Sequence, residues 1–254
     1  MAAPGKVIVL TGASRGIGLS MAQFLLQKQC RLVVVARSKE PLDRLRADYP
    51  DQVQVLSGDL SDFSIGARAT ALAIDTWGRV DGLLINHGVL EPVKQVRDAN
   101  ADDWRKAFDI NLFSAVALVQ AALPALRASK GNVVLVSSGA AVTSYTGWGA
   151  YGATKAALNH FAQTLAVEEP DITTLSIRPG VVDTSMQDNI RGVHLEHMSK
   201  SDAEKFVGLK QNGGLLKPEQ PGNVMARLVL DAPKELSGKF LSWNDKDLAS
   251  FQDA

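Results

Sequence analysis

Short runs rich in valine, isoleucine and leucine alternate along the chain with longer stretches whose apolar residues recur at helical spacing. The short runs predict seven strands, near residues 6–11, 31–36, 53–57, 80–85, 132–137, 172–178 and 239–242. The longer stretches predict helices near residues 17–28, 40–48, 62–77, 102–128, 152–168 and 219–231. Strands that alternate with helices in this way are typical of an α/β fold.

The predicted strands are continuously apolar and do not alternate between apolar and polar positions. Because such strands are buried on both faces, the sheet should be parallel, with helices on each side. We therefore expect a doubly wound, seven-stranded parallel sheet. No repeat, low-complexity tract or linker divides residues 1–254, so we expect a single domain, in which the irregular stretch near 185–217 is an insertion over a binding site.

Composition and charge narrow the class of protein. The 254 residues are 46% hydrophobic, which suits one domain with a sizeable core. The 27 basic and 27 acidic residues cancel, so we expect neither a nucleic-acid nor a membrane partner. The single cysteine, the lack of a signal-peptide pattern and the lack of an apolar run near the roughly 20 residues of a membrane span predict a soluble, cytoplasmic protein.

The stretch TGASRGIG, residues 11–18, matches two catalytic patterns. One is a G-x-S-x-G nucleophile elbow, with Ser14 as the attacking group of a hydrolase. The other is a glycine-rich turn that holds a dinucleotide pyrophosphate at a helix N-terminus. Only 11 residues precede Gly12, too few for the strand and oxyanion-hole loop that a hydrolase needs, so the dinucleotide turn is the prediction and the hydrolase a remote alternative.

A second group of polar residues lies further along the chain. Tyr151 and Lys155 are four residues apart and share one face of a predicted helix. Taken alone, such a pair is more often an ordinary exposed pair. Here Ser138 follows the end of a predicted strand, where a parallel sheet opens its ligand crevice, and Asn111 lies on the preceding long helix. A metal site is not expected, because His194 and His197 have no cysteine or carboxylate trio nearby.

Six motifs, in order, resemble the short-chain dehydrogenase/reductase family: TGASRGIG, NHG at 86–88, Asn111, SSG with Ser138, YGATK, and PGVVDT at 179–184. The chain is also similar to the branch that includes benzil reductases and is related to sepiapterin reductases. The resemblance extends from residue 6 to about 184, and the last strand agrees with it to about 243. It implies a Rossmann-type sheet and a nicotinamide cofactor. His87 departs from the family, which has a small residue there.

The resemblance also implies roles for the four polar residues. Tyr151 would be the general acid/base, Ser138 would hold the carbonyl oxygen, and Asn111 would anchor a water relay. Lys155 would grip the nicotinamide ribose. At about 5 Å its ammonium would stabilise the tyrosine phenolate by roughly 3 kcal/mol at an effective dielectric of about 20, so we expect a lowered pKa for Tyr151.

Cofactor preference follows from the end of the second strand. A site for NAD has an acid there, but this chain has Ala36 followed by Arg37 and Ser38, and Arg15 lies in the glycine turn. We therefore predict NADP(H). The expected cofactor-binding residues are Gly12, Ser14, Arg15, Gly16, Ile17, Gly18, Arg37, Ser38, Asp59, Leu60, Asn86, Gly88, Tyr151, Lys155, Pro179, Gly180, Val182 and Thr184.

The substrate is predicted from the residues around the catalytic group. Tyr145 and Trp148 fall between Ser138 and Tyr151, and Met186 begins a stretch rich in apolar residues. These three suggest a pocket for a bulky apolar or aromatic ketone or diketone, reduced to its alcohol by an NADP(H)-dependent oxidoreductase. The family implies a homodimer or homotetramer. The main alternative is a non-catalytic NADP(H)-binding redox sensor, although a sensor has no need of a proton donor.

Overall fold

The computed structural model describes residues 5–252 and shows a seven-stranded parallel sheet with strand order β3-β2-β1-β4-β5-β6-β7. The strands are β1 (Val7–Thr11), β2 (Arg31–Ala36), β3 (Val53–Ser57), β4 (Gly82–Ile85), β5 (Asn132–Val136), β6 (Thr173–Arg178) and β7 (Phe240–Ser242). All seven predicted strands are confirmed, as is their parallel pairing. Residues 1–4 and 253–254 of the expected single domain lie outside the described residues.

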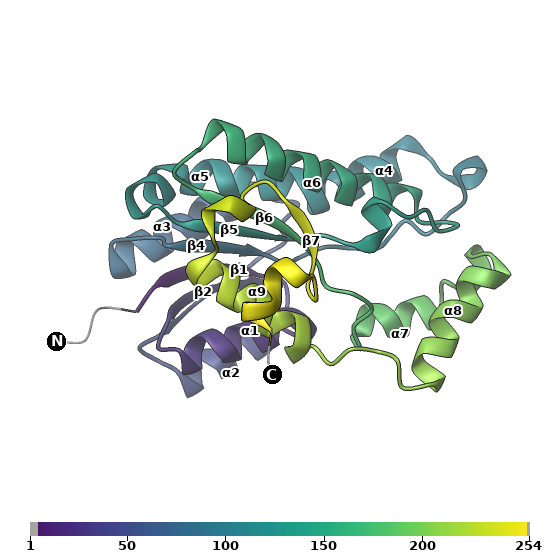
Figure 1. Ribbon diagram of the computed structural model, residues 1–254, viewed down its shortest axis with the longest axis horizontal. Coiled ribbons are helices and arrows are strands. Elements are labelled where there is room, and N and C mark those ends of the chain that lie inside the picture. The colour runs from purple at the N-terminus through teal and green to yellow at the C-terminus, as the bar shows by residue number, and fades with distance from the viewer. Residues whose placement is uncertain (1–4, 253–254) are drawn as a thin grey trace.

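Helices cover both faces of the sheet (Figure 1). One face carries α1 (Gly16–Gln27), α2 (Lys39–Asp48) and α9 (Glu219–Asp231); the other carries α3 (Ser64–Trp77), α5 (Ser114–Ser129) and α6 (Gly149–Glu168). Neighbouring residues of a strand pack into the hydrophobic cores on opposite faces of the sheet: Ile8 packs with the first set of helices and Val9 with the second. This division explains why the strands are continuously apolar, and it confirms the doubly wound architecture.

The helix predicted over 102–128 is not one regular helix. It consists of α4 (Ala101–Phe108), a π-helical turn over Asp109–Phe113, and α5, and Asn111 lies in that turn. By length and composition the continuous run Ala101–Ser129 could cross a membrane, and 39% of its most apolar window is buried inside the protein. Core helices of soluble proteins pass the same test. The sequence showed no such run because its polar residues Asp109 and Asn111 interrupt the apolar pattern.

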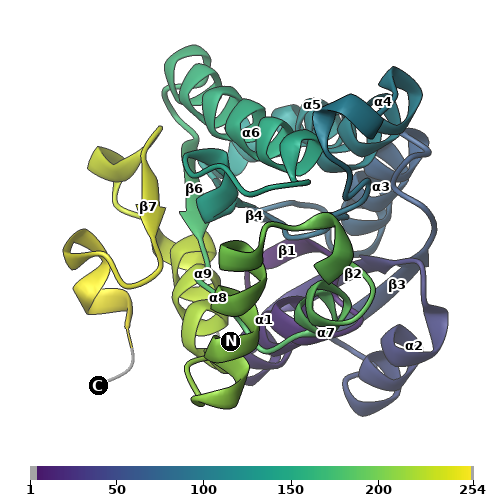
Figure 2. The same cartoon turned by 90° about the vertical axis from the view of Figure 1, so that its right-hand side faces the viewer.

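The stretch near 185–217 is not irregular. It forms α7 (Ser185–Arg191), a 3-10 turn at Leu195–His197 and α8 (Lys200–Gln211), which we call the lid segment. Figure 2 shows α7 and α8 in front of the sheet, and Figure 1 shows them to one side of the helices that cover its two faces. A parallel bridge between Val182 and Leu216 closes the base of this segment. Hydrophobic spacing did not reveal its two helices, because α7 has only seven residues and α8 buries a single residue, Phe206.

Candidate active site

A cavity of about 490 Å³ opens where the strand order reverses between β1 and β4. In an open α/β sheet this switch point, at the carboxyl ends of the strands, is where ligands bind. The cavity is lined by every predicted catalytic, cofactor and substrate residue except two, Gly18 and Asn111. Residues from many separate stretches of the chain therefore meet in one place.

The glycine turn forms one end of the cavity. Gly12 and Gly16 have φ angles of +68° and +54°, which glycine adopts without strain. Gly18 does not line the cavity, because it faces the turn: a Cβ there would lie 2.1 Å from the Gly12 oxygen. Asn86 ties the end of β4 to the same turn, since its Nδ2 donates to the Gly12 oxygen at 3.1 Å. Gly18 thus permits close packing and has no contact with the cavity.

Two cations lie at this end of the cavity. Arg15 and Arg37 are exposed, line the cavity, and have no side-chain hydrogen bond or ion pair among residues 5–252. Ala36 is buried where an acid would exclude a phosphate on the ribose. The backbone amide of Ser61 holds the pKa of Asp59 below its usual value, and Arg37 contributes to the same shift. The glycine cradle and the two free guanidinium groups fit NADP(H).

Tyr151 and Lys155 lie on α6, across the cavity from the glycine turn, and both side chains are buried. The Lys155 Nζ lies 5.8 Å from the Tyr151 ring centroid and donates to the Val136 oxygen at 2.8 Å. Burial lowers the pKa of Lys155 to about 8. Burial also raises the pKa of Tyr151, and a hydrogen bond with Ser138 only partly opposes that rise. The expected lowering of the Tyr151 pKa is therefore wrong for the protein alone, because desolvation by burial outweighs the hydrogen bond with Ser138.

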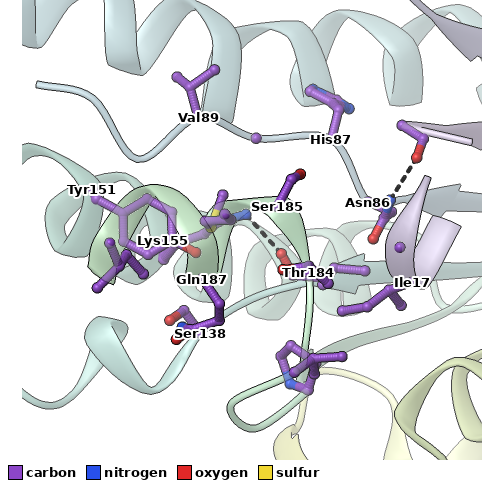
Figure 3. Close-up of a pocket in the computed structure, with 18 of the residues that line it drawn as sticks. Ile17, Asn86, His87, Val89, Ser138, Tyr151, Lys155, Thr184, Ser185 and Gln187 are labelled. Carbon is purple, nitrogen blue, oxygen red and sulfur yellow. Dashed lines mark hydrogen bonds between the residues drawn. The ribbon is translucent and has the colours of Figure 1, made fainter. Parts of the chain in front are cut away.

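Ser138 follows β5 and starts a short 3-10 turn, with its Oγ accepting from the Ala140 amide at 3.1 Å. Its hydroxyl hydrogen remains available as a donor, because that contact uses only a lone pair. Figure 3 shows Ser138, Tyr151 and Lys155 on one side of the cavity and Ile17 and Asn86 on the other. The cavity thus separates a proton-donating group from a phosphate-binding end.

Asn111 is placed next to the cavity but does not line it. Its side chain is only 1% exposed, and it clamps the loop after β4: Oδ1 accepts from the Val89 amide at 2.8 Å, and Nδ2 donates to the Val89 oxygen at 2.9 Å. The same Nδ2 donates to Thr154 Oγ1 on α6 at 3.1 Å. Asn111 therefore joins the π-helical turn, the loop after β4 and the helix of Tyr151.

His87, the departure from the family, is part of a similar network. Its Nε2 lies 3.0 Å from the Ile110 oxygen and 2.7 Å from Ser114 Oγ, and its Nδ1 lies 2.7 Å from Thr11 Oγ1. Because a carbonyl only accepts, Nε2 carries the proton and Nδ1 accepts from Thr11. Burial lowers the pKa of His87 to about 3, and Lys155 adds to the shift. A neutral imidazole thus connects β1 to the turn that holds Asn111.

The lid end of the cavity is aromatic. Trp148 stacks on Phe206 of α8 with ring centroids 5.2 Å apart, and its edge meets Tyr151 at 6.0 Å. Tyr145 packs against Trp148 at 4.9 Å and accepts a hydrogen bond from Lys205 Nζ at 2.8 Å. All three predicted substrate residues, Tyr145, Trp148 and Met186, therefore lie in the wall formed by the loop before α6 and the lid segment.

Sequence reasoning missed several cavity residues, among them Gln187 and Lys205, whereas Phe206 was expected among the apolar residues that cover the ligand. A signal existed for α8, because Ser199 caps its first turn and accepts from the Asp202 amide. The remote hydrolase alternative gains no support, because Ser14 has no hydrogen bond to a histidine within residues 5–252. The same residues contain no cluster of three metal-ligating side chains. His194 pairs with Glu91 at 3.2 Å.

Comparisons with known proteins agree with this geometry. The family model described as short chain dehydrogenase matches residues 6–193. A solved short chain dehydrogenase/reductase of Saccharomyces cerevisiae is 45% identical, with a TM-score of 0.95 over 98% of this chain and 100% of that one. A solved cytoplasmic protein of the same yeast is 43% identical, with a TM-score of 0.84 over 98% and 100%. A yeast benzil reductase, described as (S)-benzoin forming, is 41% identical over 98% of this chain and 99% of its own.

Proposed function

The chain belongs to the short-chain dehydrogenase family, and we propose that within this family of oxidoreductases it is an NADP(H)-dependent carbonyl reductase. The observation that carries the proposal is one cavity with a buried Tyr151 beside Ser138 and Lys155 at one side. At the other side lie two arginines without a hydrogen-bond or ion-pair partner among residues 5–252. The first group suits proton transfer at a carbonyl oxygen, and the second suits a phosphate on the cofactor ribose.

In this reaction each residue of the site would have its own role. The bound cofactor supplies the hydride for the carbonyl carbon. Ser138 Oγ donates a hydrogen bond to the carbonyl oxygen and fixes it beside Tyr151. Tyr151, whose pKa is raised by burial, keeps its proton at neutral pH and donates it to the oxygen as negative charge develops. The Lys155 ammonium, 5.8 Å from the centre of the Tyr151 ring, would stabilise the tyrosine oxygen once that proton has left.

The reading as a redox sensor predicts cofactor binding without turnover. The contacts around Tyr151 argue against it, because Ser138, Lys155 and the clamp formed by Asn111 all surround a proton donor that a sensor would not use. The hydrolase reading has less support. Ser14 has no histidine partner within residues 5–252, and a hydrolase nucleophile needs an adjacent base.

For the substrate we propose a bulky, apolar or aromatic ketone or diketone. Support comes from the aromatic wall of Tyr145, Trp148 and Phe206, and from the similarity to a yeast benzil reductase. The similarity to a yeast protein described as cytoplasmic supports the same location here. A homodimer or homotetramer is proposed on the family resemblance, with Phe113 at the start of α5 45% exposed on the expected contact surface.

The test compares wild-type protein with Tyr151→Phe in assays of NADPH oxidation against ketones, aldehydes and aromatic diketones, repeated with NADH. We expect turnover that favours NADPH and falls by about 10²- to 10⁴-fold in the variant, the usual contribution of a general acid. Binding of NADPH, followed by its fluorescence, should be unchanged, because the phenyl ring keeps the packing. Tight NADPH binding by the wild type with no turnover of any carbonyl would favour the sensor.

A further inference from the structure

Gln187 is a cavity residue without a role in the chemistry described above. It lies on α7 in the lid segment, is only 7% exposed, and lines the cavity together with Ser138 and Tyr151. In the view of Figure 3 the side chains of Gln187 and Ser138 lie on the same side of the cavity. A primary amide buried to this degree needs hydrogen-bond partners for both its oxygen and its nitrogen.

Arg191 fixes which way this amide points. Its Nη1 donates to Gln187 Oε1 at 3.3 Å, one helical turn along α7, and its Nη2 pairs with Asp188 at 2.7 Å. A guanidinium has only donors, so the amide oxygen must face Arg191 and the NH₂ group must face the other way. The Asp188 contact holds the guanidinium in place, which makes the orientation of Gln187 a property of the helix.

The NH₂ group of Gln187 donates to no acceptor among residues 5–252. Its nitrogen nevertheless remains accessible to solvent. It therefore opens on the cavity as an oriented pair of donors. The reacting carbonyl oxygen already has Ser138 and Tyr151, so the Gln187 donors serve another oxygen. A neutral amide suits a neutral acceptor, since a carboxylate is better matched by a guanidinium.

We propose that the NH₂ group of Gln187 binds a second carbonyl oxygen of the substrate, adjacent to the one being reduced. The inference rests on the proposed carbonyl reductase function, and it makes vicinal dicarbonyl compounds the preferred substrate class. A site that offers a buried donor rejects an analogue without the matching acceptor, because binding that analogue leaves the donor unpaired. Gln187 is thus a binding residue that selects the substrate.

The test uses benzil and deoxybenzoin, two diphenyl ketones with the same carbon skeleton that differ by one carbonyl oxygen. Wild-type protein should prefer benzil. Gln187→Met keeps the length of the side chain and removes the donors, so kcat/KM for benzil should fall about tenfold, with deoxybenzoin within about twofold, as expected for one lost hydrogen bond. Activity on deoxybenzoin also reports that the variant is folded.

Three further proteins sharpen the test. Gln187→Glu keeps the contact with Arg191 but presents an acceptor to the substrate, and should lower benzil turnover at least as far as Gln187→Met. Arg191→Met frees the amide to rotate and should lose part of the benzil preference. Asn189→Ala, on the exposed face of the same helix and outside the cavity, should behave as wild type.

Several outcomes would overturn the inference. Equal losses on benzil and deoxybenzoin, or a wild type that reduces other ketones but not benzil, would leave the reductase standing and remove the subsite. Weaker NADPH binding by Gln187→Met, with equal losses on both ketones, would assign the amide to the cofactor. A preference for benzoylformate over 1-phenyl-1,2-propanedione would show that the second oxygen belongs to a carboxylate. If the wild-type protein reduces none of these carbonyl compounds, the proposed reductase function itself is wrong.

Discussion

The two ends of the cavity are built in different ways. At the glycine turn the backbone forms the surface: Gly12 and Gly16 take positive φ angles, and Gly18 leaves no room for a Cβ. At the lid end the surface is made by side chains from distant parts of the chain, with Trp148 stacked on Phe206. A backbone requirement leaves a fixed pattern in the sequence, whereas a packed wall can be made by many combinations of residues.

The largest effect on binding is expected from Gly18→Ala, which disrupts the glycine-turn end of the cavity. The new methyl group would lie 2.1 Å from the Gly12 oxygen, so the turn must move; we expect NADPH affinity to fall by about a hundredfold and stability by about 1–3 kcal/mol. Fluorescence titration and thermal unfolding measure the two effects. Gly78→Ala is the control, because its φ is +75° with nothing within 4 Å, and it should bind NADPH normally. Normal binding by Gly18→Ala would contradict the backbone argument.

Arg37→Ala tests the charge at the same end. Loss of a charge-assisted hydrogen bond to a ribose phosphate should raise KM for NADPH about 10- to 100-fold and change KM for NADH by less than about twofold. Steady-state kinetics with each cofactor measure this difference. Arg44→Ala, which removes an exposed arginine of α2 outside the cavity, is the matched control. Equal changes with both cofactors would remove the argument for NADP(H).

His87→Gln tests the network between the two ends. Burial lowers the pKa of His87 to about 3 in the folded protein, whereas an unperturbed histidine has a pKa of about 6.5. Between these pH values the unfolded chain binds an extra proton, so stability falls as pH drops through that window. Glutamine cannot titrate, so the variant should lose about 3 kcal/mol less than wild type from pH 7 to 4. Urea unfolding across that pH range measures the difference, with exposed His160→Gln as control. Parallel curves would show that His87 is protonated in the folded protein.

The smallest effect is expected at the lid end of the cavity, whose surface is made by side chains. Asp202 of α8 accepts from the Thr146 amide at 2.9 Å and so holds the lid segment against the loop before α6. Asp202→Ala removes this neutral-donor contact and should raise KM for bulky ketones about two- to fivefold while NADPH affinity stays constant. Ketone and NADPH titrations separate the two quantities. Exposed Glu204→Ala on the same helix should change neither, and a loss of NADPH affinity in Asp202→Ala would mean that the two ends are not independent.

The same contrast explains what the sequence predicted. The seven strands, the glycine turn and the pair Tyr151 and Lys155 follow from periodicity and fixed spacing. The π-helical turn at Asn111 escaped, because one extra residue in a turn barely alters hydrophobic spacing. The rise in the Tyr151 pKa escaped as well, because desolvation depends on how tightly the surroundings pack.

Gln187 shows the limit most clearly. The identity of the residue does not predict which end of its side-chain amide faces the cavity. That orientation comes from Arg191 four residues later, whose own position depends on Asp188. A spacing of four between two long polar residues is common on exposed helices, so only the burial of Gln187 makes the pair informative.

The bridge between Val182 and Leu216 has a consequence for how such proteins diversify. It brings the two ends of the lid segment side by side, and the Leu216 amide donates to the Val181 oxygen at 2.9 Å while the Asp183 amide donates to the Leu216 oxygen at 2.8 Å. A segment whose ends meet on one short ladder can be exchanged for another of different length without moving the strands beneath it. Exchange at this bridge would replace the part of the cavity wall that α7 and α8 supply, Gln187 and Phe206 included, while the strands and the glycine turn are inherited unchanged.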